Sequence, residues 1–215
     1  GNSGRSNIIK DAVRYAYTSG CVVLAAAGND NYDAALYSPA CLREVITVGA
    51  CDHNDQRSVW SKIKASNFGL NIDVVAPGGG DVNWAAQDLN LVSDILSLKA
   101  TALTPILIVG TNYLRSAGTS MSTPHVSGLA ALLLSKNSTF TNEDIRNILR
   151  LSADDLGISG RDDYFGYGRI NAWKALKLDK VNIQGRIISP EFYGYVSYNN
   201  PVTITGYASG VDFKR

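Results

Sequence analysis

Three nearly continuous apolar segments constrain this chain more than any other feature of its sequence. They are CVVLAAAG at 21–28, EVITVGA at 44–50 and IDVVAPG at 72–78. Strands that are apolar at almost every position, without alternation, are typical of a parallel sheet that is buried on both faces. Because helical patterns lie between and around these segments, the order of elements predicts a layered α/β domain.

Two segments have strong helical character. In NIIKDAVRYAY at 7–17, apolar residues recur on one face, Ser6 is a candidate N-cap and Gly20 is a candidate end. From about 121 to 135 the chain is apolar at nearly every helical position. This pattern predicts a central helix that is surrounded by the rest of the fold.

Two shorter helices are expected near the end of the α/β region. Thr141 and Asp144 have the spacing of a capping box at a helix start. The apolar residues that share one face of this helix are Ile145, Ile148 and Leu149. AWKALK at 172–177 predicts a closing helix.

The totals exclude several classes of function. Of 215 residues, 45% are hydrophobic and 18% are charged, which is typical of a globular chain. The net charge of +1 gives no electrostatic reason to expect nucleic acid or an anionic membrane as a partner. No apolar run approaches the roughly 20 residues that span a bilayer. Residue 1 is Gly and no leader pattern follows, so we expect any signal peptide to lie outside this sequence.

The three cysteines are Cys21, Cys41 and Cys51. A strand of about seven residues, at roughly 3.3 Å each, separates the last two by some 20 Å. Disulfide-bonded Cα atoms lie within about 7 Å, so this pair should not form a bridge. We expect buried free thiols.

The composition changes after about residue 178. The last segment is rich in β-branched and aromatic residues and turn signals, and it has no helical period. We therefore predict two domains, an α/β domain at 1–178 and the truncated beginning of a β-sandwich-like accessory module at 179–215. Within the first domain, the stretch 79–115 is less clear and could form a hairpin or a short helix.

The segment SAGTSMSTPHVSG at 116–128 contains Ser120, for which two roles are compatible with the sequence. Ser120 could be an N-cap of the following helix, a role that serine often fills. It could instead be a nucleophile at the positive end of that helix. Pro124 is compatible with both, because proline is tolerated in the first turn of a helix. This segment alone leaves both hypotheses open.

Four blocks of the chain resemble the subtilases, the subtilisin-like serine proteases. GTSMSTPHVSG resembles the motif around their serine, and AAAGND at 25–30 resembles their oxyanion-hole segment. The stretch from VITVGA to VVAPG resembles the strand, loop and strand that follow, with Phe-Gly and Ala-Pro-Gly landmarks. FGYGRINAWKAL resembles the closing helix of the family. The blocks occur in the family order and cover about residues 1–178.

The resemblance implies a role for each matching residue. Ser120 matches the nucleophile and Asn29 matches the side chain that donates to the oxyanion of the tetrahedral intermediate. Thr119 is expected to support this region. Residues that match walls of the substrate pocket are Ala26, Ala27 and Gly28. Without the resemblance, Gly-Asn after a strand would be interpreted as a turn.

The histidine and aspartate that the family uses with its serine have no match. The two histidines are His53, in a polar loop, and His125, within the serine motif itself. Neither has the family's His-Gly-Thr-His context, and no Asp-(Thr/Ser)-Gly block is present. In subtilases both blocks precede the serine, so we expect that the N-terminal half of the catalytic domain is missing from this sequence.

The resemblance thus implies a secreted serine endopeptidase that cuts polypeptides and needs no cofactor for its chemistry, with structural calcium expected in the full-length protein. Asp52 and Asp55 lie in a loop that could be solvated or could hold a weak cation site. The stretch between Pro77 and Gly118 is longer than in small subtilisins and contains an insertion. Two alternatives remain: an inactive subtilase-like scaffold, or a protein that binds a ligand through its β-module.

Overall fold

The computed structural model of the protein describes residues 2–3, 6–80, 93–100, 108–179, 184–189 and 201–209. The chain divides into two compact units, Gly1–Lys177 and Leu178–Arg215.

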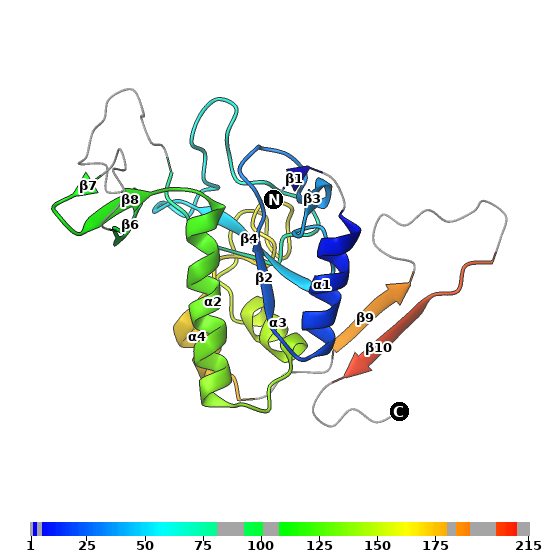
Figure 1. The fold of residues 1–215 in the computed structure, drawn as a ribbon. Coiled ribbons are helices and arrows are strands. Elements are labelled where there is room, and N and C mark those ends of the chain that lie inside the picture. The colour runs from blue at the N-terminus through cyan, green and yellow to red at the C-terminus, as the bar shows by residue number, and fades with distance from the viewer. Residues whose placement is uncertain are drawn as a thin grey trace. The chain divides into compact units, whose positions relative to one another are not determined.

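A parallel sheet forms the centre of the first unit. It consists of β2 (Val23–Ala26), β4 (Val45–Cys51) and β5 (Val74–Pro77), in the order β2-β4-β5. All seven residues of the central strand β4 are buried, so both faces of the sheet are covered. This burial explains why the strands are apolar without alternation. The predicted α/β fold with a parallel sheet is confirmed (Figure 1).

The helices begin and end close to the predicted positions. They are α1 (Asn7–Thr18), α2 (Thr119–Lys136), α3 (Asn142–Leu151) and α4 (Ala172–Lys177). The Ser6 hydroxyl accepts the Ile9 N–H at 3.4 Å, which confirms the N-cap of α1. Thr141 and Asp144 form the expected capping box of α3. The apolar face of α3 is fully buried and comprises Ile145, Ile148 and Leu149.

Helix α2 departs from the prediction in two respects. It contacts all three strands of the parallel sheet, as well as α3 and α4, but one of its sides is open. Ala131 and Leu132 lie on that side, and Leu132 is 54% exposed, so the expectation of burial all round is wrong for these residues. The helix also begins earlier than predicted, with Gly118 as its N-cap, which places Pro124 inside the helix and beyond its first turn.

Short antiparallel strands complete the first unit. Strand β1 (Asn2–Ser3) pairs with β3 (Tyr37–Ser38), which follows a 3-10 turn, η1 (Ala34–Leu36). Strands β6 (Ile95–Leu98), β7 (Ile108–Val109) and β8 (Tyr113–Ser116) form a sheet in the order β6-β8-β7. Where it is described, the stretch before α2 is therefore β structure; the remainder of 79–115 lies outside the described residues.

The second unit contains β9 (Gln184–Ser189) and β10 (Thr205–Ser209), which pair in antiparallel fashion with an irregularity between Thr205 and Gly206. Most of the predicted module at 179–215 lies outside the described residues. Its assignment to a β-sandwich-like accessory domain stays a prediction.

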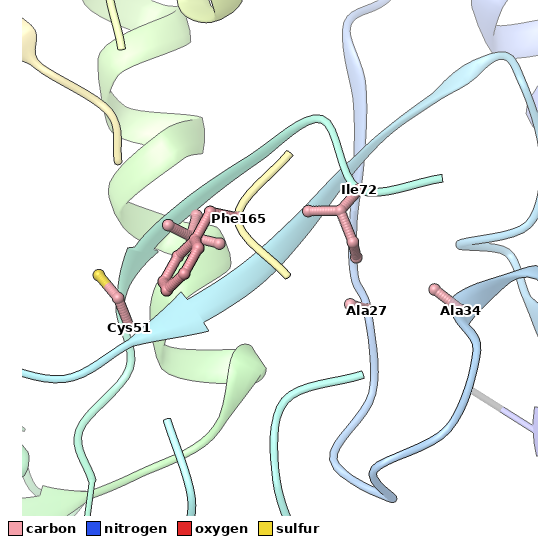
Figure 2. Packing of buried hydrophobic residues seen from close by; sticks show 6 residues of the cluster. Ala27, Ala34, Cys51, Ile72 and Phe165 are labelled. Atoms are coloured by element: carbon pink, nitrogen blue, oxygen red, sulfur yellow. The ribbon is translucent and has the colours of Figure 1, made fainter. Parts of the chain in front are cut away.

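Apolar side chains from distant segments meet in the core of the first unit. Figure 2 shows one cluster, which comprises Ala27, Ala34, Cys51, Ile72, Val75 and Phe165. All three cysteines are free thiols, as expected. The expectation that all are buried is wrong, because Cys21 is exposed and Cys41 is partly exposed. Burial raises the pKa of the Cys51 thiol to about 12.

None of the described helices is both long enough and apolar enough to cross a membrane.

Candidate active site

The turn that follows β2 carries Asn29 toward the start of α2. Gly28 adopts φ +106°, a conformation that side chains rarely tolerate, and it lets the chain turn away from the strand. Its N–H donates to the Thr119 hydroxyl over 3.2 Å. The first residue of α2 is therefore bonded to the residue that precedes Asn29.

Two hydrogen bonds from Thr119 determine the orientation of the Asn29 side chain. The Thr119 N–H donates to Asn29 Oδ1 at 3.0 Å, and the Thr119 hydroxyl donates to the same oxygen at 2.9 Å. Because Oδ1 accepts both donors, the amide nitrogen Nδ2 must be on the other side of the group. Within the described part of the chain, Nδ2 has no acceptor. Asn29 thus presents a donor that none of the described residues uses.

Ser120 is the second residue of α2 and is exposed. The N-cap is Gly118, which has no side chain that could cap the helix. The hypothesis that Ser120 is an N-cap is therefore wrong. Among the described residues, neither its hydroxyl nor its N–H has a hydrogen-bond partner. Both groups lie at the helix N-terminus, where free N–H groups and the helix dipole favour negative charge.

Ser120 and Asn29 line the same cavity, which has a volume of about 570 Å³. Its other predicted lining residues are Ala26, Gly28 and Thr119. Ala27 is not among them, because its side chain is fully buried in the core cluster (Figure 2). Successive side chains of an extended strand point to opposite faces, so Ala26 and Ala27 cannot share one environment. The expectation that the Ala27 side chain forms a pocket wall is therefore corrected.

The cavity also has walls that the motif comparison missed, namely Asp30, Trp60, Ser61, Lys64 and Ala117. Trp60 is 8% exposed and packs against Ala50 and Ala117. Lys64 forms a short ion pair with Asp30, and this hydrogen bond holds the pKa of Asp30 below its ordinary value.

Three of these walls belong to one small hairpin. Val59 bridges Ala65, and the Trp60 N–H donates to the Lys64 carbonyl at 2.8 Å. The run VWSKIK at 59–64 does not alternate between apolar and polar residues, so no regular strand pattern in the sequence marks this hairpin.

Neither histidine contacts Ser120. His125 is exposed, and its Nδ1 lies 2.8 Å from the Met121 carbonyl oxygen, one turn back along α2. His53 is exposed in the loop after β4. The described residues therefore place no imidazole where it could take a proton from the Ser120 hydroxyl.

The carboxylates of the acidic loop after β4 interact with donor groups of the protein itself. Asp52 accepts the N–H groups of Asn54 and Gln56, and Asp55 pairs with Arg169. In the described ranges, no three His, Cys, Asp or Glu side chains gather closely enough to hold a metal ion.

Comparisons with known proteins agree with the motifs. The model of the subtilase family matches residues 1–168. A thermophilic serine proteinase from Bacillus sp. (strain AK1) is 40% identical over 168 residues, which are 78% of this chain and 34% of that protein. The minor extracellular protease Epr of Bacillus subtilis (strain 168) is 31% identical over 181 residues, covering 84% of this chain and 24% of Epr.

A solved protease from Pseudoalteromonas arctica PAMC 21717 has a similar fold, with a TM-score of 0.67 and 32% identity. The match covers 81% of this chain and 48% of that structure. The chain thus spans less than half the length of each of these three relatives.

Proposed function

Because the chain belongs to the subtilase family, we propose that it is the C-terminal half of the catalytic domain of a serine endopeptidase. The observation that carries the proposal is that Ser120 and Asn29 line one cavity, although they lie on different elements. Each presents groups that no described residue uses. A hydroxyl and two free N–H donors around one space are the set that acyl transfer needs.

In the proposed reaction, the Ser120 hydroxyl oxygen attacks the carbonyl carbon of a peptide bond while a base takes its proton. The carbonyl oxygen becomes negatively charged and accepts hydrogen bonds from Asn29 Nδ2 and the Ser120 N–H. The tetrahedral intermediate then expels the amine, which receives the proton, and leaves an acyl-Ser120 ester. Attack by water on this ester releases the acid and restores the serine.

Thr119 contributes to this reaction by positioning Asn29. It is 1% exposed, so its two bonds to Asn29 Oδ1 are shielded from competing water. Ala26 and Gly28 leave room in the cavity for a large apolar side chain of the substrate. The resemblance implies that Thr119 supports this region, and the proposal assigns that role to its two bonds with Asn29 Oδ1.

The base and the residue that orients it would come from the part of the catalytic domain that precedes this sequence. Two features support this second part of the proposal. Strand β2 is at the edge of the parallel sheet and pairs only with β4 among the described strands. Helix α2 exposes Ala131 and Leu132 on its open side. A further layer of the domain could pair a strand with the edge of β2 and cover Ala131 and Leu132 on α2.

The relatives in the subtilase family also support proposals about where the protein is located and which ions it binds. Secretion is supported by the extracellular relative from Bacillus subtilis. The chemistry requires no cofactor, and structural calcium would bind in the full-length protein outside the acidic loop of Asp52 and Asp55, whose carboxylates are engaged.

Labelling of the full-length protein with a fluorophosphonate tests the proposal. We expect a covalent adduct on Ser120 by mass spectrometry, no adduct in the Ser120→Ala variant, and peptide hydrolysis that is lost in the same variant. Loss of one oxyanion donor lowers kcat by about 10²–10³-fold in subtilisin, a value known for that enzyme and taken over for Asn29→Ala. A folded full-length protein that forms no adduct would instead support the inactive scaffold.

A further inference from the structure

One buried side chain, that of Asn67, forms hydrogen bonds to the turn that carries Asn29. Asn67 is fully buried and lies in the segment between the 59–65 hairpin and β5. It lies directly before the Phe-Gly landmark of the block that resembles the subtilases, and it does not line the cavity. Its contacts nevertheless surround Asn29.

Asn67 bonds the backbone on both sides of Asn29. On the near side, its Nδ2 donates to the Ala27 carbonyl at 2.9 Å and its N–H donates to the Gly28 carbonyl at 2.8 Å. On the far side, its Oδ1 accepts the N–H groups of Asp30 at 2.9 Å and Tyr32 at 3.1 Å. One primary amide supplies both the donor and the acceptor, which neither a carboxylate nor an alkyl group could do.

The turn contains two residues with positive φ, and one of them is not a glycine. Glycine adopts the φ of +106° at Gly28 without strain, and a Cβ there would lie 2.4 Å from Asn67 Nδ2, so the glycine also makes room for the amide. Asn31 has φ 59°, a conformation that non-glycine residues hold only where their surroundings support it.

We propose that Asn67 is a positioning residue for Asn29: it fixes the peptide groups on either side, so that Nδ2 of Asn29 faces the cavity. Thr119 orients the Asn29 side chain from the α2 side, and Asn67 holds the backbone from the opposite segment. The inference rests on the proposed function in so far as Asn29 is the oxyanion donor. The claim about the shape of the turn can be tested without it.

The functional test uses the full-length protein with the variants Asn67→Ala and Asn67→Asp. A misplaced donor acts in the transition state, so Asn67→Ala should lower kcat by about 10-fold to 10²-fold with little change in KM. Asn67→Asp keeps the acceptor for Asp30 and Tyr32 but places a buried carboxylate oxygen against the Ala27 carbonyl, so it should lower kcat as well. Asn71→Ala is the matched control, because Asn71 lies in the same segment, donates to the Cys41 carbonyl at 3.2 Å and has no bond to the turn.

A double-mutant cycle separates positioning from a merely structural role. If Asn67 acts through Asn29, then Asn29→Ala combined with Asn67→Ala should be no slower than Asn29→Ala alone. Losses that multiply in the double variant would overturn the proposal, and so would a normal kcat in Asn67→Ala.

Hydrogen exchange provides the readout that is independent of catalysis. In Asn67→Ala, the amides of Asp30 and Tyr32 should exchange at least about tenfold faster, whereas the Thr47 amide, which donates to Asp73, should not change. Unchanged exchange at Asp30 and Tyr32 would overturn the proposal. Activity that survives Ser120→Ala would overturn the proposed function alone, and the exchange result would still decide the role of Asn67.

Discussion

A buried carboxylate joins the parallel sheet to α3, and its removal should be costly. Asp73 directly precedes β5, and its side chain is 4% exposed. It accepts the Thr47 N–H at 2.7 Å and the Arg150 Nε–H at 2.8 Å, and Arg146 Nε lies 3.9 Å away. The perturbation we consider is Asp73→Asn, which keeps the shape of the side chain but removes its charge.

The size of the effect follows from the burial of the two arginines. The side chain of Arg146 is 2% exposed and that of Arg150 is 29% exposed. Removing one partner of a buried ion pair costs about 3–5 kcal/mol, because the other charge is left uncompensated. Since Arg150 can turn partly to water and Arg146 keeps its ion pair with Glu143 at 3.3 Å, we expect the free energy of unfolding to fall by about 3 kcal/mol, at the lower end of this range.

Urea unfolding of the full-length protein, followed by circular dichroism, measures this change. The matched control is Asp163→Asn, because Asp163 is 57% exposed and its oxygen lies 3.9 Å from Arg161. An exposed pair of this kind contributes about 0–1 kcal/mol. If Asp73→Asn cost no more than the control, the reasoning about burial and uncompensated charge would be refuted.

The same site predicts the direction of a pH dependence. Burial alone would raise the pKa of Asp73, but the charges of Arg150 and Arg146 and the Thr47 N–H outweigh it and lower the pKa. A carboxyl group with a lowered pKa stabilises the fold above its unfolded value, and this contribution is lost as the pH falls through the folded value. The wild-type protein should therefore lose stability in acid more steeply than Asp73→Asn does.

Three further changes test other parts of the structure. Gly28→Ala should disturb the Asn29 turn and cost about 1–3 kcal/mol, because φ is +106° and the new Cβ would meet Asn67 Nδ2 at 2.4 Å; an unchanged unfolding midpoint would contradict the geometry. Leu133→Ala on α2, at a fully buried position, should lower the free energy of unfolding by about 2–5 kcal/mol, whereas the exposed Leu132→Ala should lower it far less. Equal losses for the two variants in urea unfolding would contradict the described orientation of α2. A thiol reagent at pH 8 should modify Cys21 quickly and leave Cys51 intact, because Cys51 is buried and its pKa is raised to about 12. Mass spectrometry of the native protein measures the modification, and early modification of Cys51 would refute this prediction.

The sequence by itself was sufficient for features that depend on neighbours along the chain. The cap at Ser6, the capping box of Thr141 and Asp144 and the three unalternating strands each depend on residues a few positions apart. Hydrophobic periodicity and capping chemistry act over one or two turns, so they can be read before the fold is known. The family motifs added Ser120 and Asn29 as candidates.

Only the tertiary structure decided which candidates meet and what surrounds them. Asn29 and Thr119 are 90 residues apart in the chain, and no local pattern predicts their hydrogen bonds. The same holds for Asp73 and Arg150, which are 77 residues apart. Motif matching treated Ala26 and Ala27 alike, whereas the strand directs one side chain to the cavity and the other to the core.

Contacts of this kind form only when helices and strands pack, because packing brings together groups that the covalent chain keeps far apart. Asn67 illustrates the difference: the sequence places it directly before the Phe-Gly landmark without assigning it a role, and only its buried position among four backbone groups of the Asn29 turn gives it one.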